Sequence, residues 1–144
     1  MGRRASLDVI GVVALGGALG ALARYGVGLA APARPGGFPL ATFAINLLGC
    51  LLMGVLIVLV TEVWSGHRLA RPFLGTGFLG GFTTFSTYAV DGQRLLAAGR
   101  VGVALLYLVG TLVGALLAVV AGMALTRAVT GTRFSERAGN GGSR

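Results

Sequence analysis

Four long uncharged runs restrict what this sequence can fold into. They cover residues 9–23, 35–61, 72–90 and 101–126, with lengths of 15, 27, 19 and 26 residues. A helix that crosses the apolar core of a bilayer needs about 20 residues, so the last three runs are long enough by themselves. The first is long enough if the helix continues past Arg24 to Ala31, where apolar residues resume. The sequence therefore predicts an all-α membrane protein with four transmembrane helices, at about 7–31, 38–61, 71–98 and 101–126.

The composition agrees with a membrane protein of one domain. Of the 144 residues, 55% are hydrophobic and only 11% are charged. A net charge of +8 would suggest nucleic acid binding in a soluble protein, but the twelve cationic residues, all arginine, lie mostly between or beyond the apolar runs. That placement indicates contact with membrane lipid and no nucleic acid partner. We expect one transmembrane domain over residues 1–132 and a disordered polar tail over residues 133–144.

The arginines are divided almost equally between the two sides of a four-span chain. One side carries Arg3, Arg4, Arg68, Arg71 and Arg127, and the other carries Arg24, Arg34, Arg94 and Arg100. Arginine and lysine in short loops set the orientation of a membrane protein. This near balance therefore permits insertion in either orientation.

The N-terminal segment has a second interpretation, as a cleaved signal peptide. Ala21-Leu22-Ala23 has the form of a cleavage site after an apolar stretch. The apolar segment nevertheless continues beyond that site, so we interpret it as the first span. Gly16 and Gly20 in this span, like Gly122 and the small residues before it in the fourth, are spaced for close helix contacts.

The most unusual stretch is GTGFLGGFTTFSTY, residues 75–88, which places four glycines and five serine or threonine residues in an apolar run. Glycine and β-branched threonine disfavour a helix, so we predict a break at about residues 80–84 between two half-helices. Free carbonyls at such a break are ligands for a hard cation such as Na⁺, and the second half-helix presents N–H groups to an anion. A packing kink without an ion is the alternative.

Polar and aromatic residues in the spans suggest how an anion could be recognised. The amide of Asn46 makes either an interhelical hydrogen bond or a hydrogen bond to an anion in a pore. Phe85 and Tyr88 share a helix face and could turn their positive ring edges toward a small anion, although aromatic spacing is also typical of a core. Arg24 either reaches the headgroups or lines a water-filled entrance.

No enzyme is indicated. His67 is the only histidine, lies in the polar connection 62–71 and has no catalytic partner. Cys50 is the only cysteine, which excludes an intrachain disulfide, and we interpret it as a packing residue. The match of residues 75–80 to G-x-G-x-x-G lacks the strand and the acidic residue of a dinucleotide site.

Three motifs resemble the Fluc fluoride channels, also called the CrcB family. They are GGALGALARYG at 16–26, FAINLLG at 43–49 and GTGFLGGFTTFSTY at 75–88. The resemblance implies a four-helix subunit that pairs antiparallel with a copy of itself in the bacterial inner membrane. This dual-topology homodimer would conduct fluoride passively out of the cytoplasm through two pores, around a structural Na⁺ that is not transported.

The resemblance also implies roles for individual residues. The backbone carbonyls of Gly80 and Thr83 would hold the sodium ion. The residues that would line the pore are Arg24, Asn46, Thr84, Phe85, Ser86, Thr87, Tyr88, Tyr107 and Thr111. Many family members have phenylalanine at the position of Tyr88, and Ala115 stands where the polar series of Tyr107 and Thr111 would continue. The alternative is a small multidrug-type exporter, against which we note that no carboxylate lies inside an uncharged run.

Overall fold

The computed structural model describes residues 2–32, 34–63 and 68–131, and every regular element in these ranges is helical. The elements are α1 (Gly2–Ala30), α2 (Leu40–Val58), the π-helices η1 (Leu59–Val63) and η2 (Pro72–Leu79), α3 (Gly80–Phe82), α4 (Phe85–Ala97) and α5 (Val101–Thr130). The predicted all-α class is therefore confirmed for the described part of the chain. His67 and the predicted tail at 133–144 lie outside it.

Three helices in the described ranges are long and apolar enough to cross a membrane. They are Ser6–Ala30, Leu40–Val63 and Val101–Thr130. They correspond to the predicted first, second and fourth spans, and they carry many exposed apolar side chains, such as those of Leu116 and Val129. The chain is thus a multi-pass membrane protein. The predicted third span consists of shorter helices, η2, α3 and α4.

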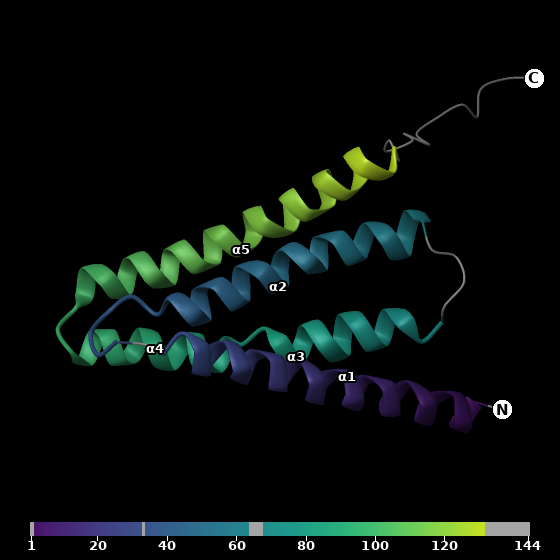
Figure 1. The fold of residues 1–144 in the computed structure, drawn as a ribbon, viewed down its shortest axis with the longest axis horizontal. Coiled ribbons are helices and arrows are strands. Elements are labelled where there is room, and N and C mark those ends of the chain that lie inside the picture. The colour runs from purple at the N-terminus through teal and green to yellow at the C-terminus, as the bar shows by residue number, and fades with distance from the viewer. Residues whose placement is uncertain (1, 33, 64–67, 132–144) are drawn as a thin grey trace, which may run out of the picture.

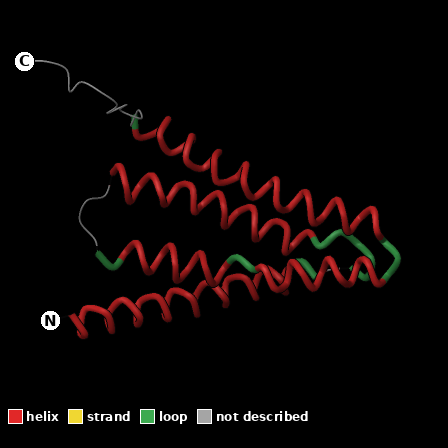
Figure 2. Tube along the Cα trace, turned by 180° about the vertical axis from the view of Figure 1, so that it is seen from behind, coloured by secondary structure: helices red, strands yellow, loops and turns green. Residues whose placement is uncertain are grey.

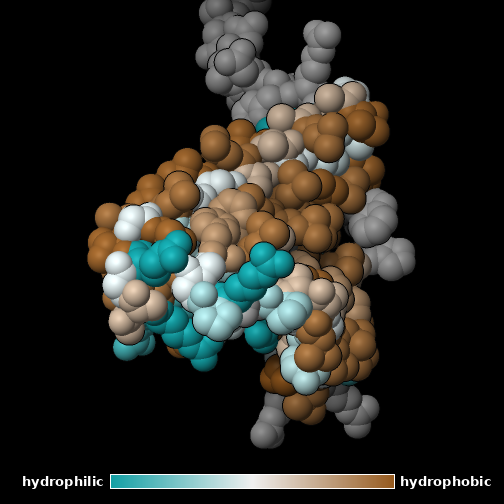
Figure 3. Space-filling model, turned by 60° about the vertical axis from the view of Figure 1, so that its left-hand side comes forward, coloured by the Kyte–Doolittle hydropathy of each residue, from teal (hydrophilic) through white to brown (hydrophobic). Residues whose placement is uncertain are grey.

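The helices form two pairs. α2 lies along α5, and α1 lies along η2 and α3 (Figure 1). The two pairs diverge toward the end where α1 begins and come together at the other end, where α4 packs on α5 (Figure 2). Hydrophilic residues gather at this second end, whereas the flanks of the helices are mainly hydrophobic (Figure 3).

Glycines make the closest contacts within each pair. A Cβ atom on Gly20 would meet the carbonyl oxygen of Phe78, and one on Gly122 would meet the carbonyl oxygen of Leu51. Gly16 similarly faces the backbone of η2. The predicted contact faces of the first and fourth spans are therefore confirmed at these glycines, and their close packing determines where η2 and α3 lie.

The π-helical form of η2 is a feature that the sequence did not predict. A π-helix has a wider turn than an α-helix and often occurs at functional sites. η2 begins at Pro72, and its buried residues are Gly75, Gly77 and Leu79, so two of the three have no side chain. A Cβ atom on Gly77 would stand 2.9 Å from the carbonyl oxygen of Val13, so α1 approaches η2 where side chains are absent.

Candidate functional site

The helical chain is interrupted at Thr83 and Thr84. α3 ends at Phe82 and α4 begins at Phe85, while both threonines have extended backbone angles, φ −73° and ψ 156° for Thr83 and φ −146° and ψ 122° for Thr84. β-branched residues suit this conformation. The Thr84 side chain also caps α4, since its Oγ1 accepts a hydrogen bond from the N–H of Thr87 at 3.1 Å.

The interruption is shorter than predicted. Gly80, expected inside the break, has helical angles of φ −63° and ψ −37°, and Gly81 is helical as well. The low helix propensity of glycine is overridden here by close packing, because a Cβ atom on Gly81 would overlap the backbone of Gly17 in α1. The prediction that residues 80–84 unwind together is therefore wrong for the glycines.

Asn46 holds the interruption from the neighbouring helix α2. Its Nδ2 donates to the carbonyl oxygen of Thr84 at 3.0 Å, and its Oδ1 accepts from the N–H of Thr84 at 2.9 Å. The Asn46 side chain thus replaces both backbone partners that Thr84 would have in a helix. Because the Thr84 N–H needs an acceptor and its carbonyl needs a donor, these two bonds also determine which end of the Asn46 amide is oxygen. The predicted interhelical hydrogen bond is confirmed, and the second N–H of Nδ2 is left over for another acceptor.

Arg24 supports the interruption from the other side. Its Nε donates to the carbonyl oxygen of Gly81 at 3.1 Å, and the contact is partly buried. Cationic side chains commonly bind the last carbonyls of a helix. Arg24 therefore connects α1 to the end of α3.

Carbonyl groups at the interruption lose their helical donors, among them those of Gly80 and Thr83. In a continuous α-helix the carbonyls of Gly80 and Thr83 would accept from the N–H groups of Thr84 and Thr87. Those two N–H groups instead bind Asn46 Oδ1 and Thr84 Oγ1. Gly80 and Thr83, predicted to offer carbonyl ligands, are thus among the residues whose carbonyls lose their helical donors at the interruption.

A groove of about 460 Å³ opens beside the interruption, between α2, α4 and α5. We call it the central groove. It is lined by Asn46, Cys50, Thr83, Thr84, Phe85, Tyr88, Thr111, Leu112 and Ala115. The structure therefore brings together most of the residues predicted to line a pore. Cys50 was interpreted from the sequence as a packing residue only. Its position one helical turn after Asn46 is the signal that could have placed it in this lining.

The aromatic residues of the central groove differ in exposure and in hydrogen bonding. Phe85 is 80% exposed, and its ring centroid lies 5.7 Å from that of Tyr88. The hydroxyl of Tyr88 donates to the carbonyl oxygen of Leu108 in α5 at 2.9 Å. The extra hydroxyl at this position thus anchors the ring to α5, and the ring itself remains beside Phe85.

Thr111 lies at the surface of the central groove, whereas Tyr107 lies deeper, in the core. Thr111 lines the central groove and donates its hydroxyl to the carbonyl oxygen of Tyr107 at 2.6 Å. Tyr107 is fully buried behind Tyr88, at a centroid distance of 5.4 Å, and its hydroxyl has no hydrogen-bond partner in the part of the chain that the structure describes. Ala115 lines the groove without a hydroxyl, so the predicted polar series ends at Thr111.

Ser86 and Thr87 lie outside the lining of the central groove. Ser86 is exposed, with its Oγ 3.4 Å from Oγ1 of Thr84. Thr87 is half-buried and accepts a hydrogen bond from the Thr84 hydroxyl at 3.0 Å. Both therefore belong to the hydroxyl cluster at the start of α4.

Asp91 is the polar residue whose importance the sequence did not reveal. Its side chain is 9% exposed, and its Oδ2 accepts from the Thr42 hydroxyl at 2.8 Å. Carboxylates inside the uncharged runs would have indicated an exporter, but Asp91 lies just outside them. Asp91 comes directly after the third uncharged run, and α2 and α5 bury it. The positions of the charged residues in the sequence could not indicate this burial. We call the buried polar residues of this region the polar seam: Thr42, Asn46, Asp91, Tyr107 and Thr111.

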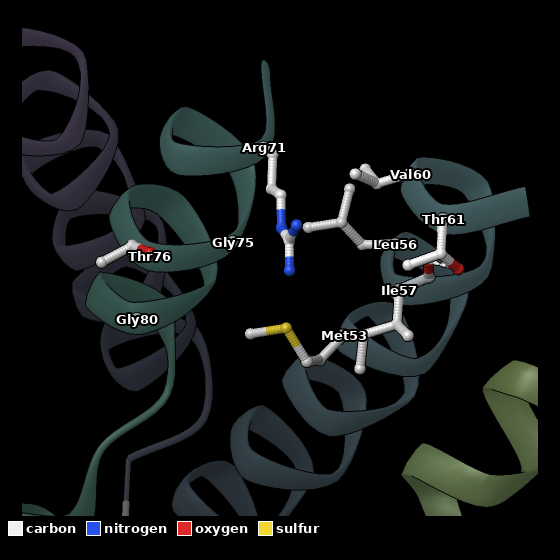
Figure 4. Close-up of a pocket in the computed structure, with 9 residues that line it drawn as sticks. All are labelled: Met53, Leu56, Ile57, Val60, Thr61, Arg71, Gly75, Thr76 and Gly80. Carbon is white, nitrogen blue, oxygen red and sulfur yellow. Dashed lines mark hydrogen bonds between the residues drawn. The ribbon is translucent and has the colours of Figure 1, made fainter. Parts of the chain in front are cut away.

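Gly80 faces a separate cavity of about 400 Å³, between α2 and η2 (Figure 4). Arg71 points into it from above, toward Met53, while Leu56 and Ile57 form an apolar wall. Gly80 thus lines this cavity, whereas Thr83 lines the central groove.

Most of the chain matches a known family. Residues 11–123, which include the interruption, the central groove and the polar seam, match the family described as CrcB-like protein, Camphor Resistance (CrcB). The chain belongs to the CrcB-like family. The family predicted from the three motifs is therefore confirmed.

Similar CrcB-like proteins are named as fluoride channels. Fluoride-specific ion channel FluC 2 of Streptomyces avermitilis is 58% identical over 72% of this chain, a match that covers 66% of that protein, just under two thirds. FluC 1 of Streptomyces coelicolor is 55% identical over 82% of this chain and 77% of that protein. FluC 2 of Nocardia farcinica is 54% identical over 83% of this chain and 85% of that protein.

We predict that Asn46→Ala destabilises this CrcB-like protein. The change would leave the partly buried N–H and carbonyl of Thr84 without the side chain that binds both, at a cost of up to about 1–3 kcal/mol for each group that water does not reach. Leu48→Ala is the matched control, because Leu48 lies on the same helix and is 47% exposed. Thermal unfolding in detergent should show a lower Tm for Asn46→Ala than for the control, and equal Tm values would show that Asn46 does not hold the interruption.

Proposed function

We propose that this chain is a passive fluoride channel of the bacterial plasma membrane, which lowers cytoplasmic fluoride and its toxicity. It is a transport protein, not an enzyme. The observation that carries the proposal is the central groove, in which Asn46, Phe85, Tyr88 and Thr111 line one cavity in a chain whose relatives are named fluoride-specific ion channels.

The lining of the central groove suits a small anion that must enter and leave. It offers the second N–H of Asn46 and two aromatic rings, whose edges are positive, but no full charge. Conduction requires binding strong enough to admit the ion and weak enough to release it. The hydroxyls of Thr84 and Thr111 already donate within the protein, so the amide of Asn46 is the donor that remains for fluoride.

The proposal includes a third span that is broken in mid-membrane. η2, α3 and α4 would cross the bilayer together, with the interruption at Thr83 and Thr84 near its centre. Exposed carbonyls at that depth are tolerable only against protein, ion or water. This supports a site at the break over a simple kink.

It also includes an antiparallel homodimer around a structural sodium ion. The carbonyl oxygens of Gly80 and Thr83 from both copies would bind the sodium ion. The helical donors of these carbonyls are redirected, and the two oxygens of one chain are too few to coordinate the ion alone. Bound sodium would supply a positive charge that holds these carbonyl dipoles together. The near-even division of arginines supports insertion in both orientations.

A small multidrug-type exporter is the second candidate, favoured by one observation. Asp91 is a buried carboxylate of the kind that proton-coupled exporters use. Both of its oxygens are engaged, however, one by the Thr42 hydroxyl and one by Arg94 at 3.7 Å. No carboxylate lines the central groove, so an organic cation finds no counter-charge there.

Liposomes that contain only this protein should release fluoride and retain chloride. Fluoride release after addition of an ionophore for the counter-cation would be followed with a fluoride electrode, and chloride release with a chloride electrode. Empty liposomes are the control. An absence of fluoride release from folded protein contradicts the channel, and efflux that requires a proton gradient and an organic cation identifies the exporter.

Phe85→Ile should lower the fluoride flux and leave the dimer intact. The substitution removes a ring edge whose contact is worth about 1 kcal/mol, and the flux should fall about five- to tenfold. Leu112→Ile, an aliphatic change in the same groove, should leave the flux unchanged. If the two variants conduct alike, Phe85 packs in the dimer and does not contact the ion.

Removal of sodium should weaken the dimer. A ligand that binds only the assembled protein stabilises it by about 2.7 kcal/mol at a hundredfold excess over its Kd. Purification in N-methylglucamine at constant ionic strength should therefore lower the Tm and the dimer fraction in size-exclusion chromatography, and added Na⁺ should restore both. A dimer that is indifferent to this exchange contradicts the sodium site.

A further inference from the structure

A second polar hollow lies at the end of the molecule where α4 meets the connection between α1 and α2. Its volume is about 250 Å³. It is lined by Arg34, Pro35, Gly36, Gly37, Pro39, Asp91, Arg94 and Leu95. We call it the arginine hollow. Figure 3 turns this end of the molecule forward and shows hydrophilic residues gathered between hydrophobic flanks.

The arginine hollow carries more positive than negative charge. Arg34 and Arg94 line it with one carboxylate, that of Asp91, and Arg94 approaches Asp91 at 3.7 Å. Arg34 has no ion pair within the described ranges. The side chain of Arg100 also passes Gly36 of the lining, since its Cγ would stand 3.9 Å from a Cβ atom on Gly36. A concave site of one sign raises the local concentration of the opposite ion.

The floor of the hollow continues into the polar seam. Asp91 accepts a hydrogen bond from Thr42, and Thr42 lies one helical turn before Asn46 on α2. Tyr107, which is fully buried, belongs to the same polar seam. The Thr42–Asp91 hydrogen bond therefore connects the floor of the arginine hollow to α2, the helix that also carries Asn46 of the central groove.

We infer that the arginine hollow collects anions at one end of the fluoride path. Arg34 and Arg94 attract fluoride before it enters the polar seam. Asp91 competes with the anion for the guanidinium of Arg94, which keeps the ion from being trapped. The inference rests on the proposed channel function and adds residues outside the central groove to it.

The test measures fluoride conductance in planar bilayers of phosphatidylcholine, which has no net charge. The proteins are the full-length wild type, Arg34→Gln, Arg94→Gln, the double variant and Arg34→Lys. Arg68→Gln is the matched control, because it removes the same charge from an exposed residue near Asp8 at the other end of the molecule. Fluoride is held at a low concentration, and potassium gluconate sets the ionic strength.

At an ionic strength of about 0.01 M, where the Debye length is about 30 Å, the double variant should conduct about three- to tenfold less than wild type. At about 1 M the Debye length is about 3 Å, and the difference should nearly disappear. Arg34→Lys and Arg68→Gln should match wild type at both ionic strengths. Size-exclusion chromatography of each variant checks that it is folded.

Equal conductance of the double variant and wild type at low ionic strength would overturn the inference, and so would a loss that ionic strength does not change. A loss that occurs only when phosphatidylglycerol is added would assign the arginines to lipid headgroups, which also overturns it. Wild-type protein that conducts no fluoride would instead overturn the channel function itself. The wild-type trace therefore separates the two failures.

Discussion

The double hydrogen bond between Asn46 and Thr84 is the interaction on which the rest of the site depends. An interrupted helix inside a membrane protein leaves backbone groups that hydrocarbon cannot satisfy. Asn46 satisfies the N–H and the carbonyl of Thr84, and by taking that N–H it withdraws the partner of the Gly80 carbonyl. One side chain thus stabilises the interruption and creates the carbonyl that the proposed sodium site uses.

The spans were the part of the fold most readily predicted from sequence. Long uncharged runs identify transmembrane helices because charge is costly in hydrocarbon, whatever the helices pack against. The third span was harder, since its backbone depends on tertiary contacts. Glycine propensity predicted an unwound Gly80 and Gly81, but α1 packs against them as helix, and the extended residues are the two threonines.

The site residues also divide into those that the sequence predicted and those that depend on tertiary contacts. The motif at 75–88 and Asn46 named most of the lining of the central groove, because their chemistry is unusual in an apolar run. The partner of Asn46 was not predictable, since a hydrogen bond between α2 and residue 84 depends on helix packing. Asp91 was missed for a related reason: it looks like a surface residue in the sequence, and only the approach of α2 and Thr42 buries it.

The surface of the single chain argues that a second copy completes the channel. Phe85 is 80% exposed beside the central groove, and Gly80, on the other side of the interruption, is exposed as well. Lipid cannot cover this surface cheaply, because the Gly80 and Thr83 carbonyls would then face hydrocarbon without donors. An antiparallel copy would cover it with the same set of groups, so that each groove gains a wall and each interruption gains a second set of carbonyls. Channel, sodium site and dimer are in this sense one proposal, because all three are argued from the same exposed interruption.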